Sequence, residues 1–249
     1  MLKGFYNVTS AMLVQQRNLN VVGNNLTNIS TAGFKQSRYT SSTFDDVMFN
    51  RVGNKDKSGM ENIGRISYIR ATDEIYTNFT QGVPEPTDIN LDWAIEGDGF
   101  FAIQRADGVA YTRMGSFSLD EEGYLYLNGQ GRVLDDQGQP ILLNTDKITC
   151  DDAGRIYTED GDFLGRLGVY VFEDNGALEY DQQAMFTGGQ AQLMDSPLVH
   201  WRYLERSNTD MVQQMTEMLT SERALQSAAQ VAKMYDTLMT KASTDLGRL

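Results

Sequence analysis

The stretch GNNLTNISTAGFK, residues 23–35, closes a helical pattern and then interrupts it sharply. Asn24, Asn25 and Asn28 lie just before the interruption, although asparagine is a mediocre helix former that prefers caps and turns. Amides donate and accept hydrogen bonds and carry no charge to desolvate, which suits close contact between helices. The stretch therefore predicts the end of a long N-terminal helix that forms a packing interface.

The sequence also suggests how this helix stops. Gly33 suits the left-handed residue just past a helix end, and Phe34 would then pack back on Ile29, as in a Schellman cap. Asn24 and Asn28 are four residues apart and share one helix face. We expect that face to point away from the apolar stripe and to contact a neighbouring subunit.

Both ends of the chain carry a seven-residue apolar repeat, which is typical of coiled-coil seams. In residues 5–29 the two columns are Phe5, Met12, Leu19, Leu26 and Val8, Gln15, Val22, Ile29. Near the C-terminus the column is Leu204, Met211, Met218, Leu225, Ala232, Met239, Leu246. Neither helix can bury its stripe alone, so we expect the two terminal helices to pair as a coiled coil; the alternative is that each is an ordinary amphipathic helix docked on the protein's own core.

The centre of the chain has a different pattern, with short alternating runs such as AIEGDGFFAIQ separated by Gly turns. This pattern predicts antiparallel hairpins and hence a sandwich or barrel-like core. The fold class is therefore α+β. The expected divisions are a coiled-coil helix at 1–35, an extended excursion at 36–80 with a short helical turn at Phe44–Phe49, a β-rich outer domain at 81–200, and a second coiled-coil helix at 201–249.

Composition excludes several kinds of site. The net charge of −13, without a Lys/Arg cluster, argues against nucleic acid. With one cysteine, Cys150, and one histidine, His200, neither an internal disulfide nor an ordinary zinc site is expected. The Asp-rich turns lack the calcium-loop spacing and GDGF lacks the dinucleotide-binding spacing. We therefore expect no catalytic residues, no metal and no cofactor. No apolar run approaches the roughly 18 residues of a membrane span, and the first residues do not resemble a secretory signal peptide.

Three separated blocks resemble the flagellar basal-body rod and hook family. They are NNLTNISTAGFK at 24–35, AIEGDGFFAI at 94–103 continuing into YTRMGSFSLDEEGYL at 111–125, and YLERSNTDMVQQMTEML at 203–219. Thr27, Arg202 and Thr209 depart from the residues usual in that family, as does SERAL at 221–225. The blocks occur in the family's order, and this order and spacing extend over nearly the whole chain.

The resemblance implies a structural, self-assembling rod subunit that stacks helically around a central channel. It implies neighbouring rod and hook proteins and surrounding envelope ring proteins as partners, a place in the cell envelope, and export through the flagellar secretion channel without a cleaved signal. The residues expected at the assembly interface are Asn24, Asn25, Leu26, Asn28, Ile29, Gly33, Phe34, Leu204, Ser207, Asn208, Met211, Met218, Leu225 and Met239.

Two other classes of function remain open from the residues alone. A secreted β-domain adhesin on a coiled-coil stalk would need a stalk continuous in sequence, which the chain lacks. A glycan hydrolase would need a carboxylate pair on a recognisable scaffold, and none is evident among the many acids. For the rod subunit, removal of residues 1–35 is expected to abolish polymerisation while the β core still folds.

Overall fold

The computed structural model describes residues 2–43, 47–51, 61–66, 70–181 and 184–246. The chain divides into two compact units. Unit 1 comprises Met1–Leu26, Ser37–Tyr76 and Met211–Leu249, and unit 2 comprises Thr27–Gln36 and Thr77–Asp210. Each unit is therefore built from segments that are far apart in the sequence.

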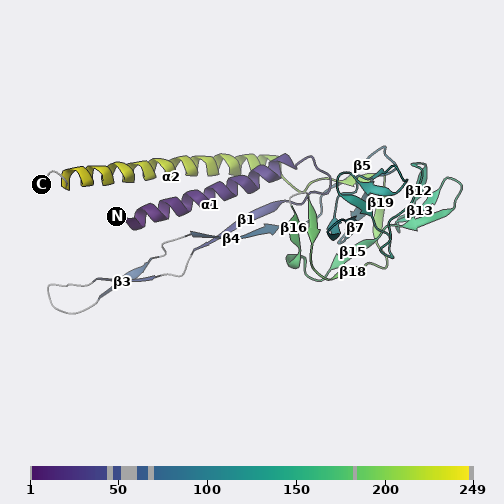
Figure 1. Ribbon diagram of the computed structural model, residues 1–249, viewed down its shortest axis with the longest axis horizontal. Coiled ribbons are helices and arrows are strands. Elements are labelled where there is room, and N and C mark those ends of the chain that lie inside the picture. Colours follow the sequence, from purple (N-terminus) through teal and green to yellow (C-terminus); the bar gives the residue numbers. More distant parts are fainter. Residues whose placement is uncertain (1, 44–46, 52–60, 67–69, 182–183, 247–249) are drawn as a thin grey trace. The chain divides into compact units, whose positions relative to one another are not determined.

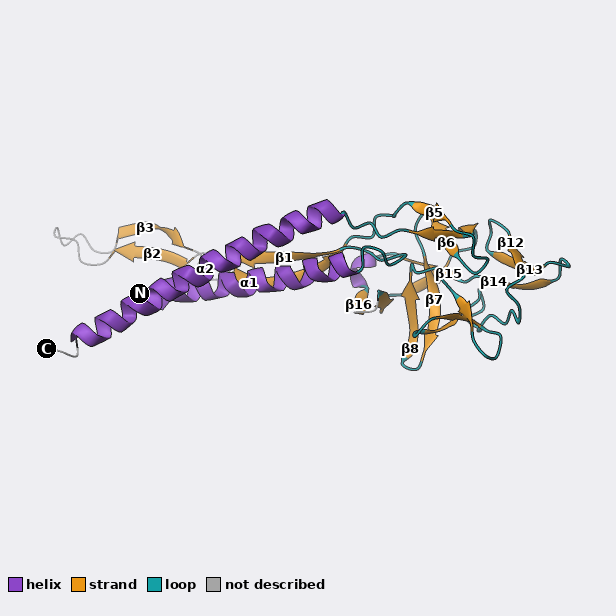
Figure 2. Ribbon diagram, turned by 90° about the horizontal axis from the view of Figure 1, so that it is seen from above, coloured by secondary structure: helices purple, strands orange, loops and turns teal. Residues whose placement is uncertain are grey.

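Unit 1 contains the two long helices, α1 (Leu2–Thr27) and α2 (Met211–Leu246). They run in opposite directions (Figures 1 and 2). Its strands pair in twos, β1 (Ser37–Thr43) with β4 (Arg70–Thr77) and β2 (Val47–Arg51) with β3 (Glu61–Ile66). The expected helical turn at Phe44–Phe49 is wrong for Val47–Phe49, which belong to β2; its residues 44–46 lie outside the described residues.

Polar side chains and a glycine join α1 to α2. Asn25 donates to Gln214 Oε1 at 3.1 Å, and Asn18 donates to Ser221 Oγ at 2.9 Å. Gly4 lies against Tyr235, because a Cβ at Gly4 would be 2.4 Å from the tyrosine hydroxyl oxygen. The α1 partners in these pairs are spaced by multiples of seven, as are the α2 partners, in opposite order along the chain.

This contact differs from the predicted apolar seam. Gly4, Asn18 and Asn25 contact α2; of the predicted columns, Phe5 is 40% exposed and Val22 is buried. Asn18 and Asn25 use their amides for this contact within the chain, with Ser221 and Gln214. Small residues and amides let the helix backbones approach more closely than leucine-sized side chains do, so they occupy the contact.

The ends of both helices also differ from the prediction. Helix α1 ends at Thr27, so Ile29 is not helical. Gly33 has the predicted positive φ of 69°, but its N–H donates to Glu205 O at 2.7 Å instead of to the helix end, so the Schellman cap is wrong. Helix α2 begins at Met211, and Leu204, the first member of the predicted column, lies in strand β20.

The described residues of unit 2 form the remaining strands and one 3-10 turn, η1 (Asn175–Ala177). The strands are β5 (Pro84–Pro86), β6 (Trp93–Glu96), β7 (Phe100–Arg105), β8 (Gly108–Thr112), β9 (Ser118–Leu119), β10 (Leu125–Leu127), β11 (Gly131–Val133), β12 (Ile148–Cys150), β13 (Arg155–Thr158), β14 (Phe163–Arg166), β15 (Val169–Phe172), β16 (Glu179–Asp181), β17 (Met185–Thr187), β18 (Ala191–Leu193), β19 (Leu198–Trp201) and β20 (Tyr203–Glu205).

The pairings in unit 2 confirm an antiparallel β-rich centre. The largest sheet has nine strands and runs β16-β17-β8-β7-β11-β10-β9, with β15 joining β7 and β18. Strands β12, β13 and β14 form a separate sheet, β19 pairs with β6, and β20 pairs with β5. Within the described residues these strands do not close into a barrel.

Strand β7 buries side chains on both of its faces. Phe101 packs into the main core beside Phe117 and Trp93, all of them buried. The preceding Phe100 points to the opposite face, where it meets Phe172 and other rings. That second cluster consists of Phe34, Phe79, Phe100, Tyr111, Tyr170, Phe172, Tyr180 and Phe186. Successive side chains of β7 point to opposite faces of the sheet, so the strand contributes to two packed layers.

Candidate functional site: a buried ion cluster

The most unusual feature of unit 2 is a buried cluster of three charged side chains. Glu205 Oε1 lies 2.6 Å from Lys35 Nζ, and both side chains are 1% exposed. Its other oxygen, Oε2, lies 3.4 Å from Arg113 Nη1, and that side chain is 3% exposed. Buried charges are costly unless they are paired and hydrogen-bonded, so this arrangement must be held by its surroundings.

Backbone groups complete the cluster. The Gly82 N–H donates to Glu205 Oε1 at 2.7 Å, Lys35 donates to Thr80 O at 3.0 Å, and Arg113 donates to Gly97 O at 2.6 Å. Charge-assisted bonds of this kind are stronger than neutral ones. The carboxylate of Glu205 is therefore the centre on which three chain segments converge.

Burial lowers the pKa of both cations in the cluster, Lys35 and Arg113. Removal from water lowers the pKa of Lys35, and the negative charge of Glu205 opposes this by favouring the ammonium form. The pKa of Arg113 is lowered for the same reason and is again opposed by Glu205. Without Glu205, both cations would keep the burial penalty and lose what offsets it.

Glycine allows the chain to approach the cluster closely. A Cβ on Gly33 would lie 2.3 Å from the carbonyl carbon and oxygen of Arg113, and one on Gly82 would lie 1.9 Å from Arg206 O. Any side chain at either position would push the backbones apart. The role of Gly33 is therefore in the packing of unit 2. Without a side chain, it lets the segment after α1 lie directly against the backbone of Arg113, just after the end of β8.

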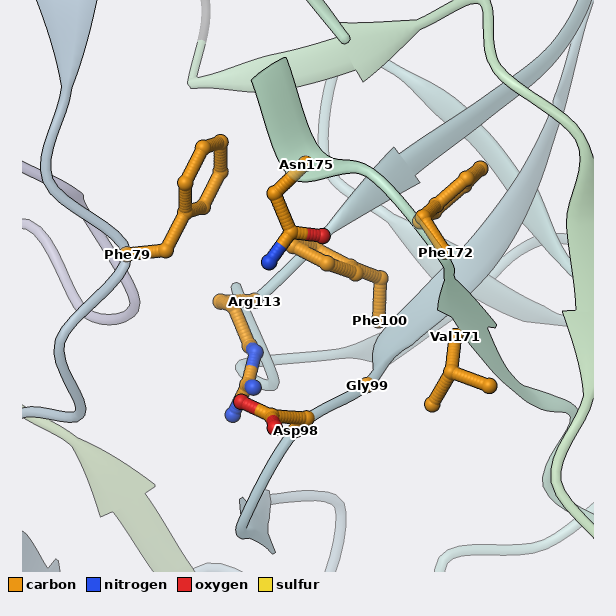
Figure 3. A pocket seen from close by; sticks show the side chains of 8 residues that line it. All are labelled: Phe79, Asp98, Gly99, Phe100, Arg113, Val171, Phe172 and Asn175. Carbon is orange, nitrogen blue, oxygen red and sulfur yellow. The ribbon is translucent and has the colours of Figure 1, made fainter. Parts of the chain in front are cut away.

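Figure 3 shows a small cavity beside the cluster, with Arg113 and Asp98 on one side and the rings of Phe79, Phe100 and Phe172 around it. Its volume is about 40 Å³, which is room for water but not for a cofactor. The Arg113 guanidinium lies 5.2 Å from the centre of the Phe100 ring. The side chain of Arg113 therefore contacts both the Phe100 ring and Glu205 of the ion cluster.

Asn208 holds together the segments around the cluster. Its Oδ1 accepts from the Gln36 N–H at 2.7 Å, and its Nδ2 donates to Asn78 O at 2.8 Å and Thr80 O at 2.9 Å. The Asn78 N–H in turn donates to Gln36 O at 2.8 Å. One amide thus links its own segment to two others that are distant in the sequence.

In unit 1, Asn25 plays a similar part. It is 1% exposed, its Nδ2 donates to Ser37 O at 2.7 Å, and its Oδ1 accepts from Ser37 N at 2.9 Å. The amide therefore pairs with both backbone groups of Ser37, as a neighbouring strand would. Together with its bond to Gln214, this ties α1, α2 and the start of β1 to one side chain.

Replacing Asn25 with alanine is expected to destabilise unit 1 by about 1–3 kcal/mol, because two buried backbone groups of Ser37 lose their partner. The measurement is thermal unfolding followed by circular dichroism at the helix band. Asn20→Ala, an exposed asparagine on the same helix, is the matched control and is expected to change little. Equal effects of both substitutions would show that the buried amide contributes nothing.

The remaining residues expected at an assembly interface fall into three settings. Phe34 is completely buried, whereas Asn24, Asn28 and Leu26 are half-buried. A surface groove of about 380 Å³ is lined by Ile29, Leu204 and Ser207 among others. On α2, Met211 and Met239 are exposed, and Met218 and Leu225 are half-buried. None of these residues belongs to the ion cluster, although Phe34 and Leu204 are next in sequence to its members Lys35 and Glu205.

Sequence reasoning missed the three cluster residues, although Lys35, Arg113 and Glu205 each lie in one of the quoted blocks. A weak signal was present, since each of the three residues follows an aromatic residue by one or two positions, in GFK, YTR and YLE. Their convergence is a property of the tertiary structure.

The lone Cys and His do not form a reactive site in the described part of the chain. His200 Nε2 lies 2.6 Å from Glu96 Oε2 at the surface, and no group of three or more potential metal ligands occurs among the described residues. Burial raises the pKa of the Cys150 thiol to about 12. The thiol therefore stays protonated at neutral pH.

Cys150 is expected to resist alkylation in the folded protein at pH 8. A pKa near 12 instead of 9 makes the reactive thiolate about a thousandfold rarer. The measurement is the labelling rate in buffer and in concentrated urea, where the ordinary pKa returns. A cysteine at the adjacent exposed position, Thr149→Cys in a Cys150→Ser background, should label quickly in both; slow labelling of Cys150 in urea as well would contradict the burial argument.

Known protein families match the chain in three segments. Residues 5–35 match the flagella basal body rod protein family, residues 94–166 the flagellar hook protein FlgE/F/G D1 domain, and residues 202–245 the flagellar basal body rod FlgEFG protein C-terminal family. Each segment contributes one member of the ion cluster.

Curated relatives match over nearly the full chain. The flagellar basal-body rod protein FlgG of Bacillus subtilis is 30% identical, over 96% of this chain and 97% of that protein. The flagellar hook-basal body complex protein FlhO of the same organism is 28% identical over the whole of both chains. The rod protein FlgF of Caulobacter vibrioides is 29% identical, over 96% and 95%.

These relatives are all flagellar proteins, so they give the adhesin alternative no support. No described helix is long and apolar enough to cross a membrane. The three matched segments and the near-complete coverage at 30% identity show that the chain belongs to the flagellar basal-body rod protein family.

Proposed function

We propose that this protein is a structural, self-assembling subunit of the flagellar rod, which stacks helically through its terminal helices around a central export channel. The observation that carries the proposal is the set of large apolar side chains exposed on both helices of unit 1. They are Phe5, Tyr6 and Leu13 on α1, and Met211, Val212, Met215, Leu219, Val231, Met234, Leu238 and Met239 on α2. Apolar rows of this extent on a helix favour contact with another protein surface.

The distribution of charge supports contact through unit 1. Unit 1 contains 12 basic and 10 acidic residues, a net charge of +2, whereas unit 2 contains 9 basic and 24 acidic residues, a net charge of −15. Copies of unit 2 therefore repel one another much more strongly than copies of unit 1 do. Assembly through the helices therefore brings together the parts of the chain between which electrostatic repulsion is weakest.

We also propose how the subunit is arranged and what surrounds it. The terminal helices pair as a coiled coil, and neighbouring rod and hook proteins, with surrounding envelope ring proteins, are the partners. The subunit lies outside the cytoplasm in the basal body, and it has no catalytic role. Heterologous head-to-tail contacts give open helical assemblies of the kind a rod requires.

A truncation tests the proposal. Phe34 and Lys35 are buried in unit 2, so removal of residues 1–35 would damage its core; deletion of residues 2–26 removes only α1 residues of unit 1. We expect this variant to lose polymerisation, measured by sedimentation and electron microscopy, and incorporation into basal bodies.

The buried Trp93 reports whether unit 2 remains folded in the same samples, through its fluorescence. Filaments of normal length from a variant without residues 2–26 would show that the terminal helices are not the assembly surface.

A further inference from the structure

Helix α2 carries the same exposed motif twice, Val-x-x-Met-x-x-x-Leu. Seam A consists of Val212, Met215 and Leu219, with 74%, 42% and 54% of each side chain exposed. Seam B consists of Val231, Met234 and Leu238, with 39%, 62% and 58% exposed. The spacing i, i+3, i+7 places each set on one face of the helix.

The two seams point in different directions. Seam B follows seam A by 19 residues, which is a rotation of about 100° around the helix and a displacement of about 28 Å along it. Neither seam uses the column of Gln214 and Ser221 that contacts α1. One straight partner helix therefore cannot cover both seams, and α1 of the same chain covers neither.

The occupant that suits both seams is a second copy of this chain. Rows of Val, Met and Leu at this spacing pack into one another as knobs into holes, so a seam on one copy can pack on the like seam of another copy. Unit 1 carries a net charge of +2, so two copies meet there against much weaker repulsion than between copies of unit 2, which carry −15 each.

We propose that seam A of one copy packs against seam B of the next, with parallel α2 helices staggered by about 28 Å. The contact joins two different surfaces, so each copy keeps one seam open and the assembly continues instead of closing as a dimer. This inference rests on the proposed function and names the residues through which the subunit contacts its own kind.

Disulfide cross-linking of the full-length chain tests the pairing. In a Cys150→Ser background, the double variant Met215→Cys with Met234→Cys should give a ladder of multimers on oxidation. Each single variant alone should give no cross-link, and an equimolar mixture of the two should stop at dimers. The matched control is Thr220→Cys with Met234→Cys, because Thr220 is exposed on the same helix but off seam A.

The outcomes separate the two proposals. If the background protein assembles but the double variant forms no ladder, or the control forms an equal one, the seam pairing is wrong and the rod function stands. Cross-linking by Met215→Cys alone would show a symmetric contact and would also overturn it. If the background protein forms no assembly at any concentration, the proposed function fails and the seam pairing fails with it.

Discussion

Replacing Glu205 with alanine is expected to lower the free energy of unfolding of unit 2 by about 3–5 kcal/mol, because it leaves two buried cations without their shared counter-ion. Lys35 and Arg113 both have almost no solvent contact, at 1% and 3% side-chain exposure. The Gly82 N–H also loses its acceptor. The measurement is urea unfolding of the full chain, followed by the fluorescence of Trp93 and Trp201, both of which lie in unit 2.

The matched control is Glu85→Ala, which removes a carboxylate from the strand paired with that of Glu205. Glu85 lies 3.0 Å from Arg206, but its side chain is 54% exposed, and pairs in contact with water contribute at most about 1 kcal/mol. If Glu205→Ala cost no more than Glu85→Ala, water would have to reach the cluster, and its description as buried would be wrong.

Replacing Phe34 with alanine, as a separate variant, is expected to lower the free energy of unfolding of unit 2 by about 3–5 kcal/mol. Removal of a fully buried ring leaves a cavity that the surroundings fill only in part. Phe34 has no solvent exposure, and its ring lies 6.4 Å from that of Tyr180 in an edge-to-face arrangement. Through Tyr180 it continues into the aromatic cluster on the second face of β7. The same urea unfolding experiment measures the effect.

Phe163→Ala is the control for ring removal, since Phe163 is 60% exposed and its loss should change stability little. The comparison also separates two interpretations of Phe34. A core residue lowers stability when truncated, whereas a residue used only for assembly would leave the stability of the free chain unchanged and weaken polymerisation alone.

The local pattern was sufficient to predict the types of element. The seven-residue columns predicted long helices at both ends, and the alternating runs between Gly turns predicted antiparallel strands at 81–200. Both patterns arise because one face of each element is buried, and the spacing of apolar residues along the chain is enough to show which face that is. The same reasoning predicted a left-handed Gly33, because its conformational freedom is a local property.

The partners of those residues were decided only by the tertiary structure. Periodicity identified an apolar stripe on α1, yet Asn18 and Asn25 meet α2, because the choice between stripes depends on how closely two helices approach. Gly33 was expected to cap a helix, yet it lies against Arg113 from a segment about 80 residues away. The ion cluster is the clearest case, since each of its three charges looks like an ordinary surface residue in its own block, and only the fold removes all of them from water together.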